Sequence, residues 1–160
     1  MSGCNHLGGL NMYHYTMCGL ENVYLKNGYE QKDTPSGKVV SIHDLEGLHK
    51  AIGKGLAAKD SELTAKEFKF LRGELDLSQR ALGMLMEKSD QIIAKYEKGE
   101  QAIPRLVDKS IRDLYMESID EGPIANLLQK LAQLDRKNRE LTFELEETES
   151  GWLFDRRVAC

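Results

Sequence analysis

The stretch from Leu77 to Gly99 constrains the fold of this chain more than any other. Ser78 and Ser89 each offer a hydroxyl that can cap the start of a helix, and apolar residues at helical spacing follow each serine. Gly99 stands where a helix would end in a left-handed residue. We therefore predict two short helices joined by a tight turn. The residues expected to face the core are Ala81, Leu82, Leu85 and Met86 in the first helix and Ile92, Ile93 and Tyr96 in the second.

Polar residues remain on the outer face of this predicted helix pair. Gln79 begins the first helix, and Asp90, Gln91, Lys95 and Lys98 lie along the second. Such a pair is typical of a helix-turn-helix, whose second helix enters the major groove of DNA with its N-terminal residues at the base edges. The alternative is a helical hairpin whose charged face is merely solvated.

Two short motifs in this stretch resemble the lambda-repressor-like (Cro/Xre) DNA-binding domain. Ser78-Gln79 is similar to the Ser/Asn-Gln opening of that family's second helix, and Tyr96–Gly99 is similar to the aromatic-Glu-basic-Gly end of its third. The resemblance implies a five-helix-type DNA-binding domain over residues 61–119. Thr64 and Glu67 form a predicted capping box at the start of its first helix.

The resemblance also implies which residues contact DNA. Gln79, Asp90, Gln91 and Lys95 fall where this family contacts DNA. Gln91 can form a bidentate bond to adenine, and Lys95 can reach the acceptors of guanine. Asp90 could accept from cytosine, or it could only cap its helix.

Other residues of the helix pair are interpreted as contacts to the DNA backbone or as structural residues. Ser78, Ser89 and Lys98 are expected to contact phosphates or to cap helices, which orients a protein without specifying sequence. Glu97 is expected to pair with a basic neighbour such as Arg80.

The charge of the chain does not by itself indicate a nucleic-acid partner. The net charge is −4, and residues 63–117 hold 10 basic and 10 acidic side chains. Because phosphate affinity grows with the number of cationic contacts, we expect modest DNA affinity per subunit. A homodimer bound to a palindromic operator would supply the remaining DNA affinity.

Cellular location is predicted from what the sequence lacks. It contains no run of 18 apolar residues, so no membrane span is expected, and its first eleven residues do not read as a secretory signal. The three cysteines are too few for a disulfide framework and favour a reducing cytoplasm.

Residues 12–60 predict a small strand-plus-helix module that follows an irregular extension, residues 1–11. Turn signals at Asn27-Gly28 and Thr34–Gly37 separate short strand candidates that extend to Ile42. The predicted antiparallel sheet packs against a helix that begins between Ser41 and Asp44. Whether the extension is part of the natural protein stays open.

The small sheet and the helix pair together resemble the zinc-ribbon antitoxins of bacterial toxin–antitoxin pairs. Those proteins hold zinc with two Cys-x-x-Cys pairs, but the residue three positions before Cys18 is Tyr15. We therefore expect neither a metal nor another cofactor. The zinc-ligand candidates weighed are Cys4, His6, His14 and Cys18.

No enzymatic activity is expected. Gly53-Lys54 suggests a phosphate loop only superficially, because Gly55 follows in place of Ser or Thr. His43-Asp44 is interpreted as a helix start, and no nucleophile has a matching set of partners.

A long C-terminal helix is predicted within residues 123–148, followed by an exposed apolar tail, residues 149–160. Seven residues step by three and four, as the a and d positions of a coiled coil do. They are Ile124, Leu127, Leu131, Leu134, Asn138, Leu141 and Leu145. We predict a dimerising coiled coil. The alternative is an amphipathic helix folded back on its own domain, since Leu128 widens the apolar stripe.

The sequence thus predicts a mainly α (α+β) protein with a small N-terminal sheet. We interpret it as a sequence-specific transcriptional regulator, a repressor that binds a palindromic operator as a homodimer. The alternative is an antitoxin that binds a toxin and autoregulates its operon. The operator sequence, the regulated genes and any effector are not contained in the sequence.

Overall fold

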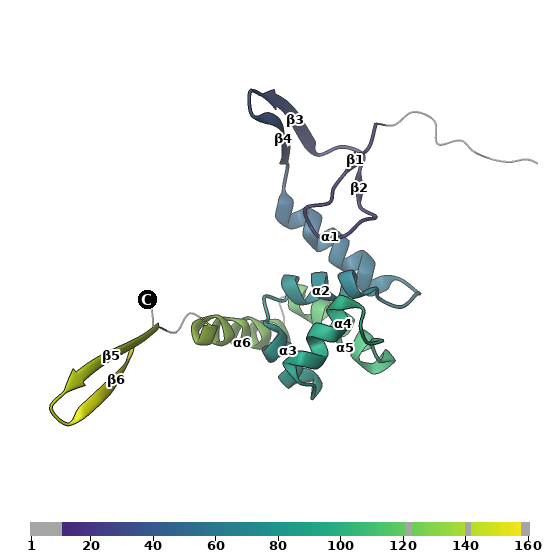
Figure 1. The fold of residues 1–160 in the computed structure, drawn as a ribbon. Coiled ribbons are helices and arrows are strands. Elements are labelled where there is room, and N and C mark those ends of the chain that lie inside the picture. Colours follow the sequence, from purple (N-terminus) through teal and green to yellow (C-terminus); the bar gives the residue numbers. More distant parts are fainter. Residues whose placement is uncertain (1–10, 121–122, 140–141, 158–160) are drawn as a thin grey trace, which may run out of the picture. The chain divides into compact units, whose positions relative to one another are not determined.

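A computed structural model describes residues 11–120, 123–139 and 142–157 (Figure 1). The protein is mainly helical with small antiparallel sheets, as predicted. Its contacts divide the chain into two compact units, Met1–Ile52 and Gly53–Cys160. The first unit contains β1 (Tyr13–His14), β2 (Tyr24–Leu25), β3 (Tyr29–Thr34), β4 (Gly37–Ile42) and the first part of α1 (Leu45–Ala58). The second contains the rest of α1, α2 (Ala65–Glu74), α3 (Gln79–Met86), α4 (Asp90–Lys98), α5 (Arg105–Ile119), α6 (Pro123–Arg139), β5 (Thr142–Thr148) and β6 (Gly151–Arg157).

The N-terminal unit contains two two-stranded antiparallel sheets, in which β1 pairs with β2 and β3 pairs with β4. The predicted turn at Thr34–Gly37 is confirmed: it joins the paired strands β3 and β4, and Gly37 has a φ of +118°, which glycine adopts without the steric cost of a Cβ. Asn27-Gly28 does not close a hairpin, because the strands before and after it, β2 and β3, belong to different sheets, although Gly28 has a φ of +78°. Tyr15 is 3% exposed, and its hydroxyl shares a 2.8 Å hydrogen bond with His49 Nε2. This bond ties the strand segment to α1.

Helix α1 crosses the boundary between the two units. It begins after Asp44, whose Oδ1 accepts a 3.0 Å hydrogen bond from the Gly47 N–H. Gly53 is buried, and a Cβ there would lie only 2.2 Å from Cζ of Tyr115 on α5. The boundary between the two units therefore lies at residue 53, inside α1. The sequence had predicted that the second domain begins at residue 61. Burial of Tyr115, together with the negative charge of Glu74, raises the pKa of its phenol to about 12.

Helices α2 to α5 enclose the core of the second unit (Figure 1). The largest fully buried side chains there are Phe68, Leu71, Leu82, Ile93, Tyr96, Ile111 and Tyr115. The rings of Phe68 and Tyr96 meet edge to face with centroids 6.0 Å apart, a favoured geometry for aromatic pairs. The predicted capping box of Thr64 and Glu67 is confirmed at the start of α2.

The C-terminal helix is shorter than predicted. It ends at Arg139, and Thr142–Thr148 is a strand that pairs with β6, so the prediction of one helix up to Glu147 is wrong. Gly151 has a φ of +115°, and Thr148 Oγ1 donates a 2.8 Å hydrogen bond to the Gly151 carbonyl, which closes the hairpin turn. Residues 142–146 also alternate in polarity with the period of a strand, and this pattern competes with the three-and-four spacing. The predicted exposed tail is therefore partly a strand.

Helix α6 folds back on its own unit through one face. Leu128 and Ala132 are buried and α6 packs against α5, as the folded-back alternative requires. Leu127 and Leu134 remain 64% and 58% exposed, and Leu131 is half-buried. Leu145, assigned to the same stripe, lies in β5. The side chains of Ile124 and Asn138 and the whole of Leu141 are outside the described residues.

Candidate nucleic-acid interface

The turn between α3 and α4 is fixed by its own backbone. Glu87 ends α3 in the left-handed conformation, and the Lys88 N–H donates a 2.8 Å hydrogen bond to the Gly83 carbonyl. A Cβ on Gly83 would lie 2.5 Å from the Lys88 carbonyl oxygen, so only glycine lets the turn pack this closely on α3. Ser89 Oγ accepts from the Ile92 N–H at 3.2 Å and starts α4, as predicted. The role of Gly83 was not seen in the sequence.

The core-facing side of the helix pair agrees with the prediction only in part. Ala81 and Leu82 of α3 and Ile93 and Tyr96 of α4 are buried. Burial raises the pKa of the Tyr96 phenol. The prediction for Leu85 is wrong, because it is 42% exposed at the end of α3. Met86 and Ile92 are half-buried.

The predicted DNA contacts at the second helix of the pair, to bases and to phosphates, lie on the exposed side of α4. Ser89, Asp90, Gln91, Lys95 and Lys98 are all exposed. Ser89 is the cap of α4, and Asp90, in the first turn, accepts from the Gln91 N–H at 2.9 Å through Oδ1. Within the described part of the chain, the side chains of Gln91, Lys95 and Lys98 form no hydrogen bond or ion pair. These three long polar side chains are therefore available to a ligand.

Glu97 joins three helices at the base of this surface. Its buried carboxylate pairs with Arg72 of α2, not with Arg80, which is exposed. Arg72 Nη2 donates to Glu97 Oε2 at 3.1 Å, and Arg72 Nη1 donates to the Leu77 carbonyl at 2.8 Å. Gln79 Nε2 donates to the same Oε2 at 2.8 Å. The network fixes α4 against α2 and α3, and it holds the predicted contact residue Gln79 through its amide.

Ser78 forms hydrogen bonds with a residue of α6. Its Oγ caps α3 by accepting from the Ala81 N–H at 3.0 Å. Its own N–H and its hydroxyl donate to Oδ2 and Oδ1 of Asp135, each at 2.8 Å. Beside this contact, Arg136 of α6 forms an ion pair with Asp76. The cap was predicted, but the carboxylate partner, 57 residues away, was not.

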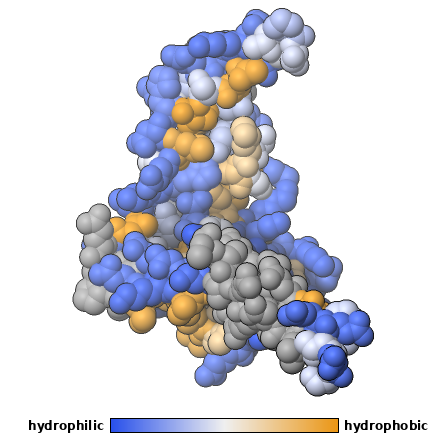
Figure 2. All heavy atoms as spheres, turned by 90° about the vertical axis from the view of Figure 1, so that its left-hand side faces the viewer, coloured by the Kyte–Doolittle hydropathy of each residue, from blue (hydrophilic) through white to orange (hydrophobic). Residues whose placement is uncertain are grey.

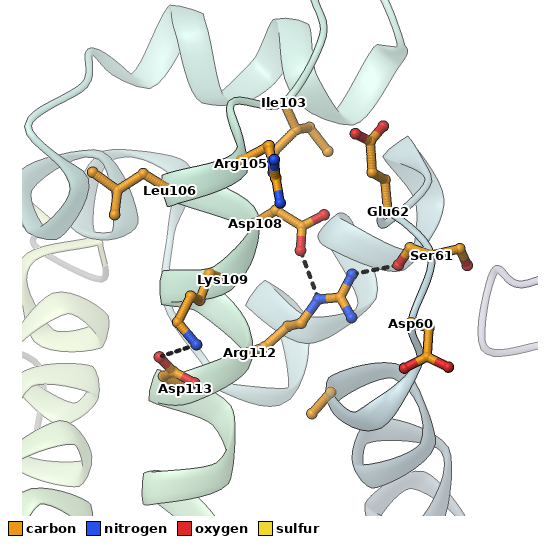
Figure 3. Close-up of a pocket in the computed structure, with 11 residues that line it drawn as sticks. Asp60, Ser61, Glu62, Ile103, Arg105, Leu106, Asp108, Lys109, Arg112 and Asp113 are labelled. Atoms are coloured by element: carbon orange, nitrogen blue, oxygen red, sulfur yellow. Dashed lines mark hydrogen bonds and ion pairs between the residues drawn. The ribbon is translucent and has the colours of Figure 1, made fainter.

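A pocket of about 720 Å³ lies between the segment after α1 and helix α5 (Figure 3). Arg112 crosses its floor: Nε donates to Asp108 Oδ1 at 2.6 Å and Nη2 donates to the Ser61 carbonyl at 2.7 Å. Asp108 Oδ2 also accepts from the Leu63 N–H at 2.8 Å. The lining carries both signs of charge, and its buried pair is already satisfied by neighbouring groups, which is the pattern of a structural network.

The described candidate metal ligands of the N-terminal unit have other contacts. His14 Nε2 lies 2.7 Å from the Glu21 carbonyl, and Cys18 Sγ donates to the Tyr15 carbonyl at 3.8 Å. In the ranges that the structure describes, no three His, Cys, Asp or Glu side chains gather as they would around a metal ion. Cys4 and His6 lie outside those ranges.

No family model, curated protein or solved structure matches the chain. Among the described helices, none has the length and apolar character needed to cross a membrane.

Proposed function

We propose that the chain is a sequence-specific DNA-binding regulator, a repressor that binds a palindromic operator as a homodimer. The observation that supports this most is the exposed row of Gln91, Lys95 and Lys98 on α4. The opposite side of α4 is anchored by buried Ile93 and Tyr96 and by the Glu97 network. A polar helix face held rigidly after a tight turn suits insertion into the major groove.

Each residue of the row has a distinct proposed role. Gln91, in the first turn of α4, offers its amide to adenine N6 and N7, and Lys95, one turn later, reaches guanine O6 or N7. Lys98, Ser89 and the free N–H of the Gln79 amide contact phosphates and set the register. Asp90 accepts from the Gln91 N–H in the first turn of α4, and its carboxylate can also accept from cytosine N4.

The test of this proposal is selection of bound duplexes from a pool of random sequence. We expect enrichment of a palindrome whose half-sites lie about 10 base pairs apart, or a multiple of that, because two recognition helices must meet the same face of the duplex. A pool that stays unenriched after several rounds would overturn the proposal.

Gln91→Ala is expected to cost about 1–3 kcal/mol of binding to the selected operator and to relax selection at one base pair per half-site. Lys98→Ala is the matched variant: if Lys98 meets only phosphate, all sequences should weaken alike and the salt slope should fall by about 1 per contact. The measurement is titration of each variant against operator and scrambled duplexes at several salt concentrations. Unchanged discrimination after Gln91→Ala would remove this residue from the reading set.

We propose that dimerisation uses the exposed leucines of α6, Leu127 and Leu134. They are seven positions apart, so they share a helix face that is distinct from the face of Leu128 and Ala132. The double variant Leu127→Glu, Leu134→Glu should be monomeric by light scattering and should bind the operator more weakly. The control, Gln129→Glu with Gln133→Glu, adds the same charge at exposed positions on the opposite side of α6 and should remain dimeric. A dimeric leucine variant would place the interface elsewhere.

A second candidate function is that of an antitoxin whose N-terminal unit binds a protein toxin. The observation that favours it is the exposure of Met17, Tyr24 and Val39, which are 80%, 54% and 53% accessible. Figure 2 shows hydrophobic residues among hydrophilic ones on the upper part of the visible face, which contains this unit. Co-expression with the product of the adjacent gene tests the idea, and a stable complex that Val39→Asp weakens is the expected result.

A further inference from the structure

The start of α3 is occupied by a carboxylate of the same chain. The first N–H groups of a helix lack partners within the helix, and the helix dipole favours negative charge there. In this structure the Ser78 N–H and hydroxyl both donate to the carboxylate of Asp135, at 2.8 Å each. A DNA phosphate would require the same two donors, because helix N-termini bind phosphates through such groups.

This occupied site adjoins the proposed DNA-binding surface. Gln79, the first residue of α3, donates to Glu97 in the last turn of α4 at 2.8 Å. The start of α3 is thus joined to the end of α4, where Lys98 is exposed. A duplex bound along α4, as proposed above, would bring phosphates to this edge, where they would meet the negative charge of Asp135.

We propose that Asp135 competes with a DNA phosphate for the start of α3, so that docked α6 lowers the DNA affinity of the free protein. The inference rests on the proposed DNA-binding function and assigns a regulatory contact to its surface. Asp135 must leave Ser78 before the phosphate binds. The neighbouring ion pair of Arg136 and Asp76 has both side chains about half exposed, 51% and 50%, so it adds little to the packing of α6 on α5 through Leu128 and Ala132.

The test compares the full-length Asp135→Ala variant with wild type, using the duplex obtained by selection from random DNA. We expect binding to tighten about tenfold, the size of effect that one charge-assisted hydrogen bond gives. Glu117→Ala, on the exposed side of α5, removes the same charge from a helix and should leave affinity within about twofold. In a Ser78→Ala background the gain from Asp135→Ala should fall to below half, because the hydroxyl donor is missing.

A measurement on the wild-type chain keeps the test independent of how the variants fold. The NMR resonance of the Ser78 amide should shift when the selected duplex is added, because its acceptor changes from carboxylate to phosphate. Two results would overturn this inference without touching the proposed function. One is a wild-type protein that binds DNA while its Ser78 resonance does not move, and the other is an Asp135→Ala variant that binds no tighter than Glu117→Ala. If neither wild type nor the Asp135→Ala variant binds any duplex, the proposed function itself fails.

Discussion

Glu97→Ala is expected to lower the free energy of unfolding by about 3–5 kcal/mol, the usual loss when one partner of a buried ion pair is removed. The side chains of Glu97 and Arg72 are only 3% and 16% exposed, so the variant leaves the Arg72 guanidinium with little water to replace its carboxylate. Gln79 loses its acceptor as well. The measurement is urea unfolding followed by circular dichroism.

Asp113→Ala is the matched control for Glu97. It breaks an ion pair between Lys109 and Asp113 that is 3.8 Å long, with side chains 77% and 66% exposed. Such a surface pair contributes about 0–1 kcal/mol, so the variant should unfold almost as wild type does. A loss of under about 1 kcal/mol for Glu97→Ala would show that the network is dispensable.

Loss of this network should also weaken the proposed binding to DNA. A domain stable by about 5–15 kcal/mol retains little margin after such a change. Molecules of the variant that stay folded have lost the contact that fixes α4 against α2 and α3. Their affinity for the operator should therefore be lower than that of wild type even at temperatures below the melting temperature.

Gly83→Ala is expected to destabilise the second unit by about 3 kcal/mol, the upper range for overpacking a close contact. The added Cβ would lie 2.5 Å from the Lys88 carbonyl oxygen, which is backbone and cannot rotate away. The turn must open, and α4 would shift on the core. Thermal unfolding and operator titration at low temperature measure the two consequences separately.

Gly73→Ala is the matched control for Gly83→Ala, because it is the same substitution in the neighbouring helix α2. A Cβ at Gly73 meets nothing within 4 Å. Alanine is favoured over glycine inside a helix by about 1 kcal/mol, so this variant should be slightly more stable than wild type. If both substitutions stabilise the protein, the close approach at Gly83 has no energetic consequence.

The sequence by itself determined the local features of the fold. A cap acts between residues three apart, so Thr64 with Glu67, Ser78 and Ser89 could each be assigned from neighbours alone. Gly99 ends α4 in the left-handed conformation for the same local reason. The exposed row on α4 followed from helical spacing, because the residues between its members are the apolar ones that must be buried.

The C-terminal region shows where spacing stops being decisive. Leu145 follows Leu141 at helical spacing, but Phe143 and Leu145 are two apart, as residues on one face of a strand are. The strand forms because Gly151 allows a tight turn and because β6 supplies a pairing partner. The three-and-four spacing gave no sign of this partner strand. Only the folded structure also separates the face of α6 that packs on α5 from the face of Leu127 and Leu134.

The remaining features depend on contacts between residues far apart in the chain. Arg80 is nearer to Glu97 in the sequence, but the packing of α2 on α4 brings Arg72 to it instead. Asp135 reaches Ser78 only because α6 returns to its own unit. Gly83 is required only because the following turn folds over it at van der Waals distance. Electrostatic and steric energies depend on distance in space, and distance in space between remote residues is set by the tertiary fold.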